Sequence, residues 1–356
     1  MYPQLTYPEA IVVGLIQGVT ELFPLSSLGH NVLIPALVGG KWAQDLNVSE
    51  PESPYLAYIV GLHVATAVAM IIYFWRDWLR IIRAFFASLG HVISPATGTS
   101  RWVPQTTDQK LSWMIIWATI PVGIAGLLLE HVFRVYLSKP VLTAVFLAIN
   151  GVILFAGEAL RKRRFGLDEQ QSALDEQVAS VGERRAASDV HAVGAGGAGG
   201  AATASRPAGQ RALKEHDAGL AVQADRRLTV VGWRTSFFLG ASQILALCPG
   251  ISRDGIVMVS GMFRGLSRQD AARFSFLLSA PVILAAGVLK VGDLFGPLGD
   301  GIRGQVLAGS IVSGVAAYLT LRFFVRYLSN SNRTLAPFAV YCLVVGIGSA
   351  IYLTIT

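Results

Sequence analysis

A carboxylate inside an apolar segment is the first feature of this chain that could do chemistry. Glu21 lies near the end of the apolar run 8–23, and Gln17 precedes it by four residues. Residues spaced by four share one face of an α-helix, so both side chains are expected to point at the same place. An ionisable group in such a segment is costly and needs a partner or a function. A buried carboxylate satisfied by a neighbouring hydroxyl is the structural alternative.

A short polar turn follows this carboxylate. Pro24 ends the first helix, and Ser26 and Ser27 stand where an N-cap would begin the next one. The free backbone N–H groups of a helix start form an anion site. His30 falls in the first turn of that second helix, so it is expected within reach of whatever Glu21 and Ser27 surround, although a lone histidine is often structural.

A second turn repeats this arrangement and adds a cation. Gly250 and Gly255 permit close approach of the backbone, Ser252 can cap a helix, and Arg253 offers a planar fork suited to phosphate oxygens. An arginine in an apolar region needs an anion. Glu21 would serve as a structural salt bridge, but two helix starts and an arginine together favour a phosphate-sized anion.

The elements that position these residues are helices in a membrane. The chain is 53% hydrophobic and 14% charged, against about 25% charged in soluble proteins. Six apolar segments are long enough to cross about 30 Å of hydrocarbon; they lie at 54–75, 111–130, 141–160, 271–293, 305–327 and 334–354. Two shorter runs, 8–23 and 234–248, stop at prolines and continue as 26–39 and 252–263. We therefore predict re-entrant hairpins at 8–39 and 234–263.

The chain is predicted to be an all-α polytopic membrane protein built from two inverted-topology repeats, 1–160 and 233–356. Both hairpins contain Gly-x-x-Gln, then Pro, then Ser-x-x-Gly, and each is followed by three spans. An odd number of crossings inverts the second copy. Most arginines expected in loops fall on one side; they include Arg76, Arg80, Arg83, Arg161, Arg264, Arg268, Arg273, Arg322, Arg326 and Arg333. The opposite loops hold only Arg134, Lys139, Lys290 and Arg303. The arginine-rich side is expected to be cytoplasmic, with residues 161–232 as a disordered cytoplasmic linker.

Composition also excludes several classes of protein. Two cysteines, Cys248 and Cys342, cannot build a disulfide framework or a cysteine-rich metal site. The net charge of +7 comes from scattered loop residues without a basic face, so we expect no nucleic-acid partner. The N-terminus lacks the basic region of a cleavable signal peptide.

Three separated motifs resemble one family. The Gln17–Glu21 pair followed by PLSSLGH (24–30), then PGISRDG (249–255) and FSFLLSAPVILAAG (274–287), are similar to the bacterial undecaprenyl-diphosphate phosphatases, also called the bacitracin-resistance proteins. The resemblance covers the chain except 161–232. It implies a plasma-membrane phosphatase that hydrolyses undecaprenyl diphosphate and recycles the lipid carrier for peptidoglycan and cell-wall synthesis.

The resemblance also implies roles for the residues above. The catalytic set is Glu21, Ser27, His30 and Arg253; the substrate-binding set is Gln17, Ser26, Gly250, Ser252 and Gly255. A divalent cation, Mg²⁺ or Ca²⁺, is implied, with Glu21 as its ligand or as a base. His30 is expected as base or acid, and Ser27 as covalent nucleophile or phosphate ligand. The partners are the polyprenyl diphosphate and membrane lipids; a homo-oligomer is compatible with the sequence, and the active site is expected to open to the outer face.

Two positions depart from the family pattern. Asp254 stands where the family commonly has Ser, and Val257 where it commonly has Thr. A carboxylate beside a diphosphate is repulsive unless a metal lies between them, so Asp254 is either an extra metal ligand or turned away. Two other functions stay open. Broken helices and inverted repeats also suit a lipid-phosphate flippase or transporter, and a scaffold acting through its linker is the third reading.

Overall fold

A computed structural model describes residues 5–46, 54–93, 106–163, 232–296, 299–330 and 332–356. By its internal contacts the chain divides into one compact unit of residues 1–158 and 225–356 and another of residues 159–224. The predicted linker 161–232 lies almost entirely outside the described residues. Everything below concerns the first unit.

The described residues are helical, with no strand among them, which confirms the predicted all-α class. Within the described part of the chain, five helices are long and apolar enough to cross a membrane; they are α6 (Thr107–Val132), the helix Pro140–Arg163, α11 (Arg268–Phe295), α12 (Arg303–Leu328) and α13 (Ala336–Ile355). The bent pair formed by α4 (Pro54–Tyr73) and α5 (Trp75–Ile93) raises the number to six if it counts as one span. Each of the six predicted spans thus corresponds to a helix.

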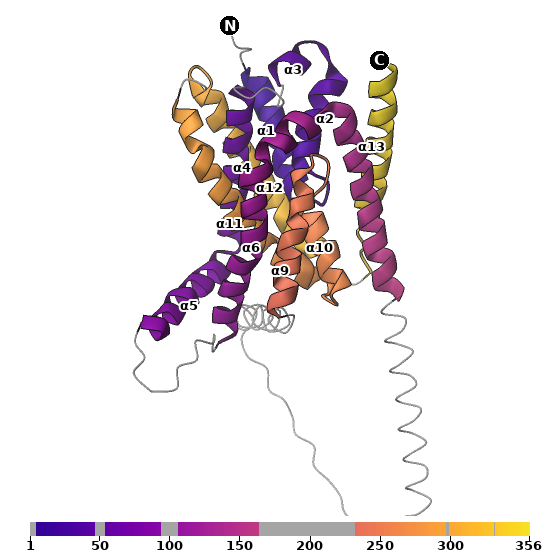
Figure 1. Ribbon diagram of the computed structural model, residues 1–356. Helices are drawn as coiled ribbons and strands as arrows, with labels where there is room; N and C mark the ends of the chain where they lie inside the picture. The colour runs from indigo at the N-terminus through magenta and orange to yellow at the C-terminus, as the bar shows by residue number, and fades with distance from the viewer. Residues whose placement is uncertain (1–4, 47–53, 94–105, 164–231, 297–298, 331) are drawn as a thin grey trace, which may run out of the picture. The chain divides into compact units, whose positions relative to one another are not determined.

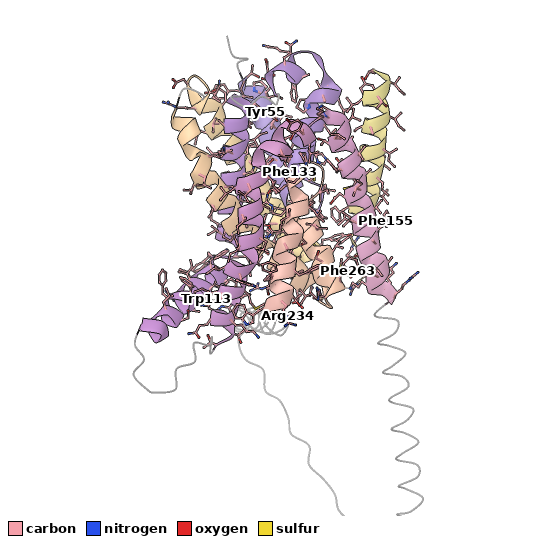
Figure 2. The ribbon with its side chains drawn as sticks, in the orientation of Figure 1. Tyr55, Trp113, Phe133, Phe155, Arg234 and Phe263 are labelled. Atoms are coloured by element: carbon pink, nitrogen blue, oxygen red, sulfur yellow. The ribbon has the colours of Figure 1, made fainter. Side chains whose placement is uncertain are left out.

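Helix α5 differs from the sequence prediction. Arg76, Arg80 and Arg83 were expected in a loop, but they lie in α5, which bends away from α4 by 86°. One face of α5 packs on α6, where Trp113 Nε1 donates a 2.9 Å hydrogen bond to Ser88 Oγ (Figure 2). The apolar residues of α5 recur with the 3.6-residue period of an amphipathic helix. The helix therefore has one apolar face and a cationic flank, whereas a membrane span is apolar over its whole surface.

Each predicted hairpin is a helix, a break and a second helix. The first consists of α1 (Tyr7–Leu22) and α2 (Ser27–Val38), and the short helix α3 (Gly40–Asp45) follows it. The second consists of α9 (Trp233–Ser242), the 3₁₀ turn Gln243–Leu247 and α10 (Arg253–Phe263). Figure 1 shows α1 and α9 starting from opposite ends of the helical bundle, so the two breaks meet between those ends.

The two halves of the chain exchange contacts reciprocally. The first hairpin helix α1 packs on α12 of the second half, and α9 packs on α6 of the first half. Small residues permit these approaches, because a β-carbon at Gly14 would strike the backbone of Gly309, and one at Gly240 would strike the backbone of Ala118. Helices α4 and α11 pack on each other between these pairs. The inverted-repeat relation itself stays a prediction.

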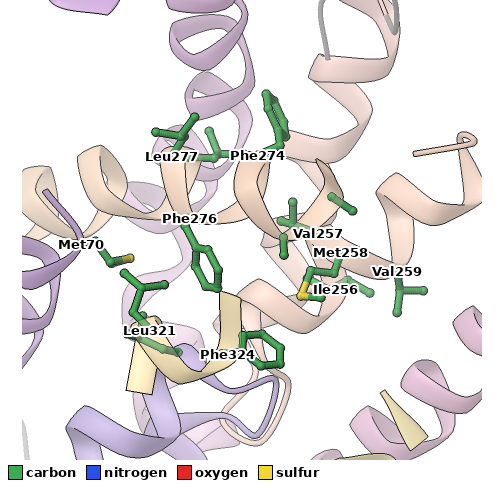
Figure 3. Close-up of a cluster of buried hydrophobic side chains, with 14 of the residues drawn as sticks. Met70, Ile256, Val257, Met258, Val259, Phe274, Phe276, Leu277, Leu321 and Phe324 are labelled. Carbon is green, nitrogen blue, oxygen red and sulfur yellow. The ribbon is translucent and has the colours of Figure 1, made fainter. Parts of the chain in front are cut away.

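The apolar core surrounds the second hairpin. Figure 3 shows Met70 of α4, Phe276 of α11 and Phe324 of α12 beside the residues of α10. Met258 and Phe276 have no exposed surface, and Phe276 and Phe324 meet edge to face with ring centroids 6.2 Å apart. Buried aromatic pairs of this kind add about 1 kcal/mol beyond their area. Helix α10, which carries Arg253, packs on α11 within this core.

Candidate active site

Glu21 is the centre of the site. Its Oε2 accepts hydrogen bonds from Gln17 Nε2, at 2.9 Å, and from Ser27 Oγ. Its Oε1 lies 3.4 Å from Arg253 Nη2, which comes from the other hairpin. Helix α1 ends one residue after Glu21 and α2 begins at Ser27, so the break between them folds the hydroxyl back onto the carboxylate. The two hairpin tips therefore meet through an ion pair.

The two helix starts have the predicted caps. Ser26 caps α2 by accepting from Gly29 N, at 3.3 Å, and Ser252 caps α10 by accepting from Gly255 N, at 3.1 Å. Both arrangements point the first N–H groups of a helix toward the region between the tips. Arg253 occupies the first position of α10, so its cation adds to the positive end of that helix.

Ser26 also fastens one tip to the other. Its Oγ accepts from Gly250 N at 3.1 Å, and Ser26 itself has a φ of 68°, which is rare for a residue with a side chain. Gly250 has a φ of 110°, and a β-carbon there would lie 2.5 Å from the carbonyl oxygen of Thr143. Only glycine fits this crossing. Strained backbone of this kind is held by its surroundings and is concentrated at functional sites.

Asn150, on the helix Pro140–Arg163, joins both tips from the side. Its Nδ2 donates to the Pro24 carbonyl at 2.9 Å, and its Oδ1 accepts from Ser252 N at 3.0 Å. The side chain is fully buried. One amide thus satisfies a backbone group of each hairpin at the point where both chains are interrupted.

His30 and Asp254 are engaged elsewhere. His30 Nδ1 donates to the Ser26 carbonyl at 2.8 Å, and its Nε2 lies 2.9 Å from the hydroxyl of Tyr341 on α13. Asp254 Oδ1 accepts from the hydroxyls of Ser275 and Ser279 on α11, at 2.6 and 2.7 Å. The structure brings Gln17, Ser27 and Arg253 into contact with Glu21. It engages His30 with Ser26 and Tyr341, and Asp254 with α11.

The site can receive an anion and accept a proton. Arg253 and the two helix starts attract phosphate oxygens, and the Glu21 carboxylate accepts a proton from a neighbouring hydroxyl. Ser27 already donates to Glu21 and so forms a hydroxyl–base pair. Among the described residues no group of three or more His, Cys, Asp or Glu could hold a metal ion. A cation at Glu21 would therefore take most of its ligands from phosphate oxygens and water, as Mg²⁺ commonly does.

Comparison with known proteins shows the family of the chain. The family model of the bacitracin resistance protein BacA matches residues 10–188 and 203–348. The chain belongs to this family. It is 52% identical over 355 residues to the undecaprenyl-diphosphatase of Mycolicibacterium paratuberculosis, with all of both chains covered. It is 49% identical to undecaprenyl-diphosphatase 2 of Frankia alni over 96% of each chain, and 34% identical to undecaprenyl-diphosphatase 2 of Burkholderia ambifaria over 95% of this chain and 93% of that one.

Several buried polar residues at the site of this bacitracin resistance family member were not predicted from the sequence. His63 of α4 has its Nε2 3.5 Å from Glu21 Oε2, and Asn31 Nδ2 donates to Gln17 Oε1 at 2.6 Å. Asn150 and Tyr341 were missed as well. Two of them could have been found from the sequence, because a polar residue inside an otherwise apolar run is costly and needs a partner. This criterion identifies His63 in α4 and Asn150 in the helix Pro140–Arg163.

Proposed function

We propose that this chain hydrolyses undecaprenyl diphosphate to undecaprenyl phosphate and inorganic phosphate. The observation that carries the proposal is the contact of Glu21 with Ser27 of its own hairpin and with Arg253 of the other. The relatives named undecaprenyl-diphosphatase, which match the chain over nearly its whole length, support the same substrate. Release of the monophosphate returns the lipid carrier to peptidoglycan and cell-wall synthesis.

Phosphoryl transfer needs charge neutralisation and an aligned nucleophile. Arg253 and the starts of α2 and α10 bind the phosphate oxygens, and Gln17 holds the Glu21 carboxylate in place. An oxygen nucleophile attacks the terminal phosphorus, and the bond from that phosphorus to the bridging oxygen breaks. The bridging oxygen leaves with the lipid monophosphate, while the nucleophile's proton passes to Glu21. The nucleophile is water or Ser27 Oγ; if it is Ser27, water then releases the phosphate from the serine.

In this scheme His30 and Asp254 have other roles than those expected from the sequence. Glu21, rather than His30, is the base in contact with Ser27, and His30 positions the start of α2 through the Ser26 carbonyl. Asp254 braces α10 against α11 through two serines. A bound Mg²⁺ or Ca²⁺ would be held at Glu21 and would neutralise charge on the phosphate oxygens.

The chain is a multi-pass membrane protein, and we place it in the plasma membrane with α5 on the cytoplasmic side. Arg76 and Arg83 are exposed on α5, and Figure 1 shows that α5 lies at the end of the bundle where α9 begins. The positive-inside rule assigns that end to the cytoplasm. The first hairpin then enters from outside, which supports access of the diphosphate from the outer face.

Purified protein tests this function directly. It is expected to release phosphate from farnesyl or undecaprenyl diphosphate in detergent with Mg²⁺ or Ca²⁺, and Glu21→Ala and Arg253→Ala are each expected to abolish release. Thr143→Val is a matched control, because the Thr143 hydroxyl is buried but has no hydrogen-bond partner among the described residues. Release that survives both site variants would refute the assignment.

Secondary carriers are also built from repeats with broken helices that pack against each other, so transport is the second candidate function. Proteoliposomes with labelled undecaprenyl phosphate separate the two functions. Movement of the monophosphate between leaflets without any phosphate release from the diphosphate would favour the carrier.

A further inference from the structure

His63 is an active-site residue without an assigned role. It lies on α4, and its side chain is 20% exposed. Its Nε2 is 3.5 Å from Glu21 Oε2. That distance is longer than an ordinary N–H···O hydrogen bond, which has a donor–acceptor distance of about 2.7–3.2 Å.

The hydrogen bond of the other ring nitrogen, Nδ1, fixes the orientation of the His63 ring. Nδ1 lies 2.9 Å from the carbonyl oxygen of Ile59, one turn earlier on α4. A backbone carbonyl only accepts, so Nδ1 carries the proton. With Nδ1 bonded to this carbonyl, Nε2 is the ring atom that faces Glu21 Oε2. A histidine that binds a metal usually has this arrangement, with its other N–H donated to a carbonyl or carboxylate.

The separation of Nε2 and Oε2 suits two ligands of one cation. Protein ligands lie about 2.0–2.6 Å from Zn²⁺, Mg²⁺ or Ca²⁺. Two ligands at right angles around one ion are then roughly 2.8–3.7 Å apart, since the separation is √2 times the bond length. The observed 3.5 Å lies within that interval.

We propose that His63 Nε2 and Glu21 Oε2 together bind the divalent cation of this site, which deepens the proposed function and rests on it. Asp254, the second ligand considered from sequence, is occupied by Ser275 and Ser279. An imidazole ligand suits Zn²⁺, Fe²⁺ or Ni²⁺ better than Mg²⁺ or Ca²⁺. The diphosphate and water supply the remaining positions.

Mn²⁺ is a direct probe because its electron spin detects a coordinated ¹⁴N nucleus. Full-length protein in detergent is titrated with Mn²⁺, with and without methylene diphosphonate, and bound ion is followed by electron paramagnetic resonance and electron spin echo modulation. The expected result is ¹⁴N modulation that becomes a ¹⁵N pattern after ¹⁵N-histidine labelling. His63→Gln is expected to remove the modulation and to weaken Mn²⁺ binding at least about tenfold relative to Ca²⁺ binding.

A matched histidine variant guards against a general effect. His30→Gln is expected to keep the modulation, because both ring nitrogens of His30 are engaged by Ser26 and Tyr341. Absence of bound Mn²⁺ under both conditions, bound Mn²⁺ without nitrogen modulation, or modulation unchanged in His63→Gln would overturn the proposal. Phosphate release is measured separately: hydrolysis without nitrogen coordination removes only this inference, and nitrogen coordination without hydrolysis removes only the proposed function.

Discussion

Replacing Asn150 by leucine tests whether the two tips are held together as the structure shows. Leucine has nearly the same volume, but it removes the donor to the Pro24 carbonyl and the acceptor for Ser252 N. Each backbone group is then left buried without that partner, at a cost of about 1–3 kcal/mol. The two together cost about 2–6 kcal/mol. The folded state can avoid this cost by moving the tips apart.

Activity is expected to fall more steeply than stability. A displacement of about 1 Å at reacting groups costs on the order of 100-fold in rate, so Asn150→Leu is expected to lose at least about 100-fold in phosphate release. Thermal unfolding in detergent should show a lower midpoint. Asn150→Asp keeps an acceptor for Ser252 N but not the donor to Pro24, and is expected to retain more activity than the leucine variant.

Thr143→Val supplies the comparison on the same helix. It also removes a buried polar group, but one with no hydrogen-bond partner among the described residues, so its midpoint and rate are expected to match the parent protein. If Asn150→Leu and Thr143→Val have the same thermal midpoint and the same rate of phosphate release, Asn150 does not hold the two tips in place.

Three further perturbations separate the scaffold from the site. Arg268→Met breaks the buried bidentate pair with Glu158, with bonds of 2.7 and 2.6 Å; it is expected to cost about 3–5 kcal/mol in unfolding while KM changes little. Gly240→Ala inserts a β-carbon into the backbone of α6 and is expected to lower the thermal midpoint, whereas Gly123→Ala, which meets nothing within 4 Å, is expected to keep or raise it by calorimetry. Asp254→Asn retains an acceptor oxygen for the two serines, so its Mn²⁺ affinity is expected to stay within about threefold of the parent value; a loss of about tenfold would show that Asp254 binds the ion.

The local signals in the sequence were sufficient to predict the helices and their breaks. Long apolar runs predicted the six spans, and prolines predicted the ends of α1 and of the 3₁₀ turn before α10. Ser26 and Ser252 were recognised as caps because capping depends on residues within one turn. The spacing of Gln17 and Glu21 correctly predicted their contact.

Contacts between segments far apart in the chain were harder to predict from the sequence. Asn150 meets Pro24 across 126 positions, and nothing local distinguishes it from a single polar residue in a span. His30 lies in the first turn of α2, as predicted, but its Nε2 contacts the hydroxyl of Tyr341 on α13, which is 311 positions away. Arg80 was assigned to a loop, whereas its ion pairs with Asp77 and Asp108 help order α5 as a helix beside α6.

The two hairpins share a motif but do not do the same chemistry, and the local helix type gives the reason. In α1 the helix stays α-helical through Glu21, so Gln17 and Glu21 are about 40° apart around the axis. In the second hairpin the chain becomes 3₁₀ at Gln243, which puts residues four apart about 120° from each other. Leu247, moreover, stands where Glu21 stands in the first hairpin. The second hairpin therefore has no carboxylate at the position that matches Glu21, and its Asp254 is bonded to Ser275 and Ser279. It contributes Arg253 instead, so the pair of hairpins forms one centre rather than two.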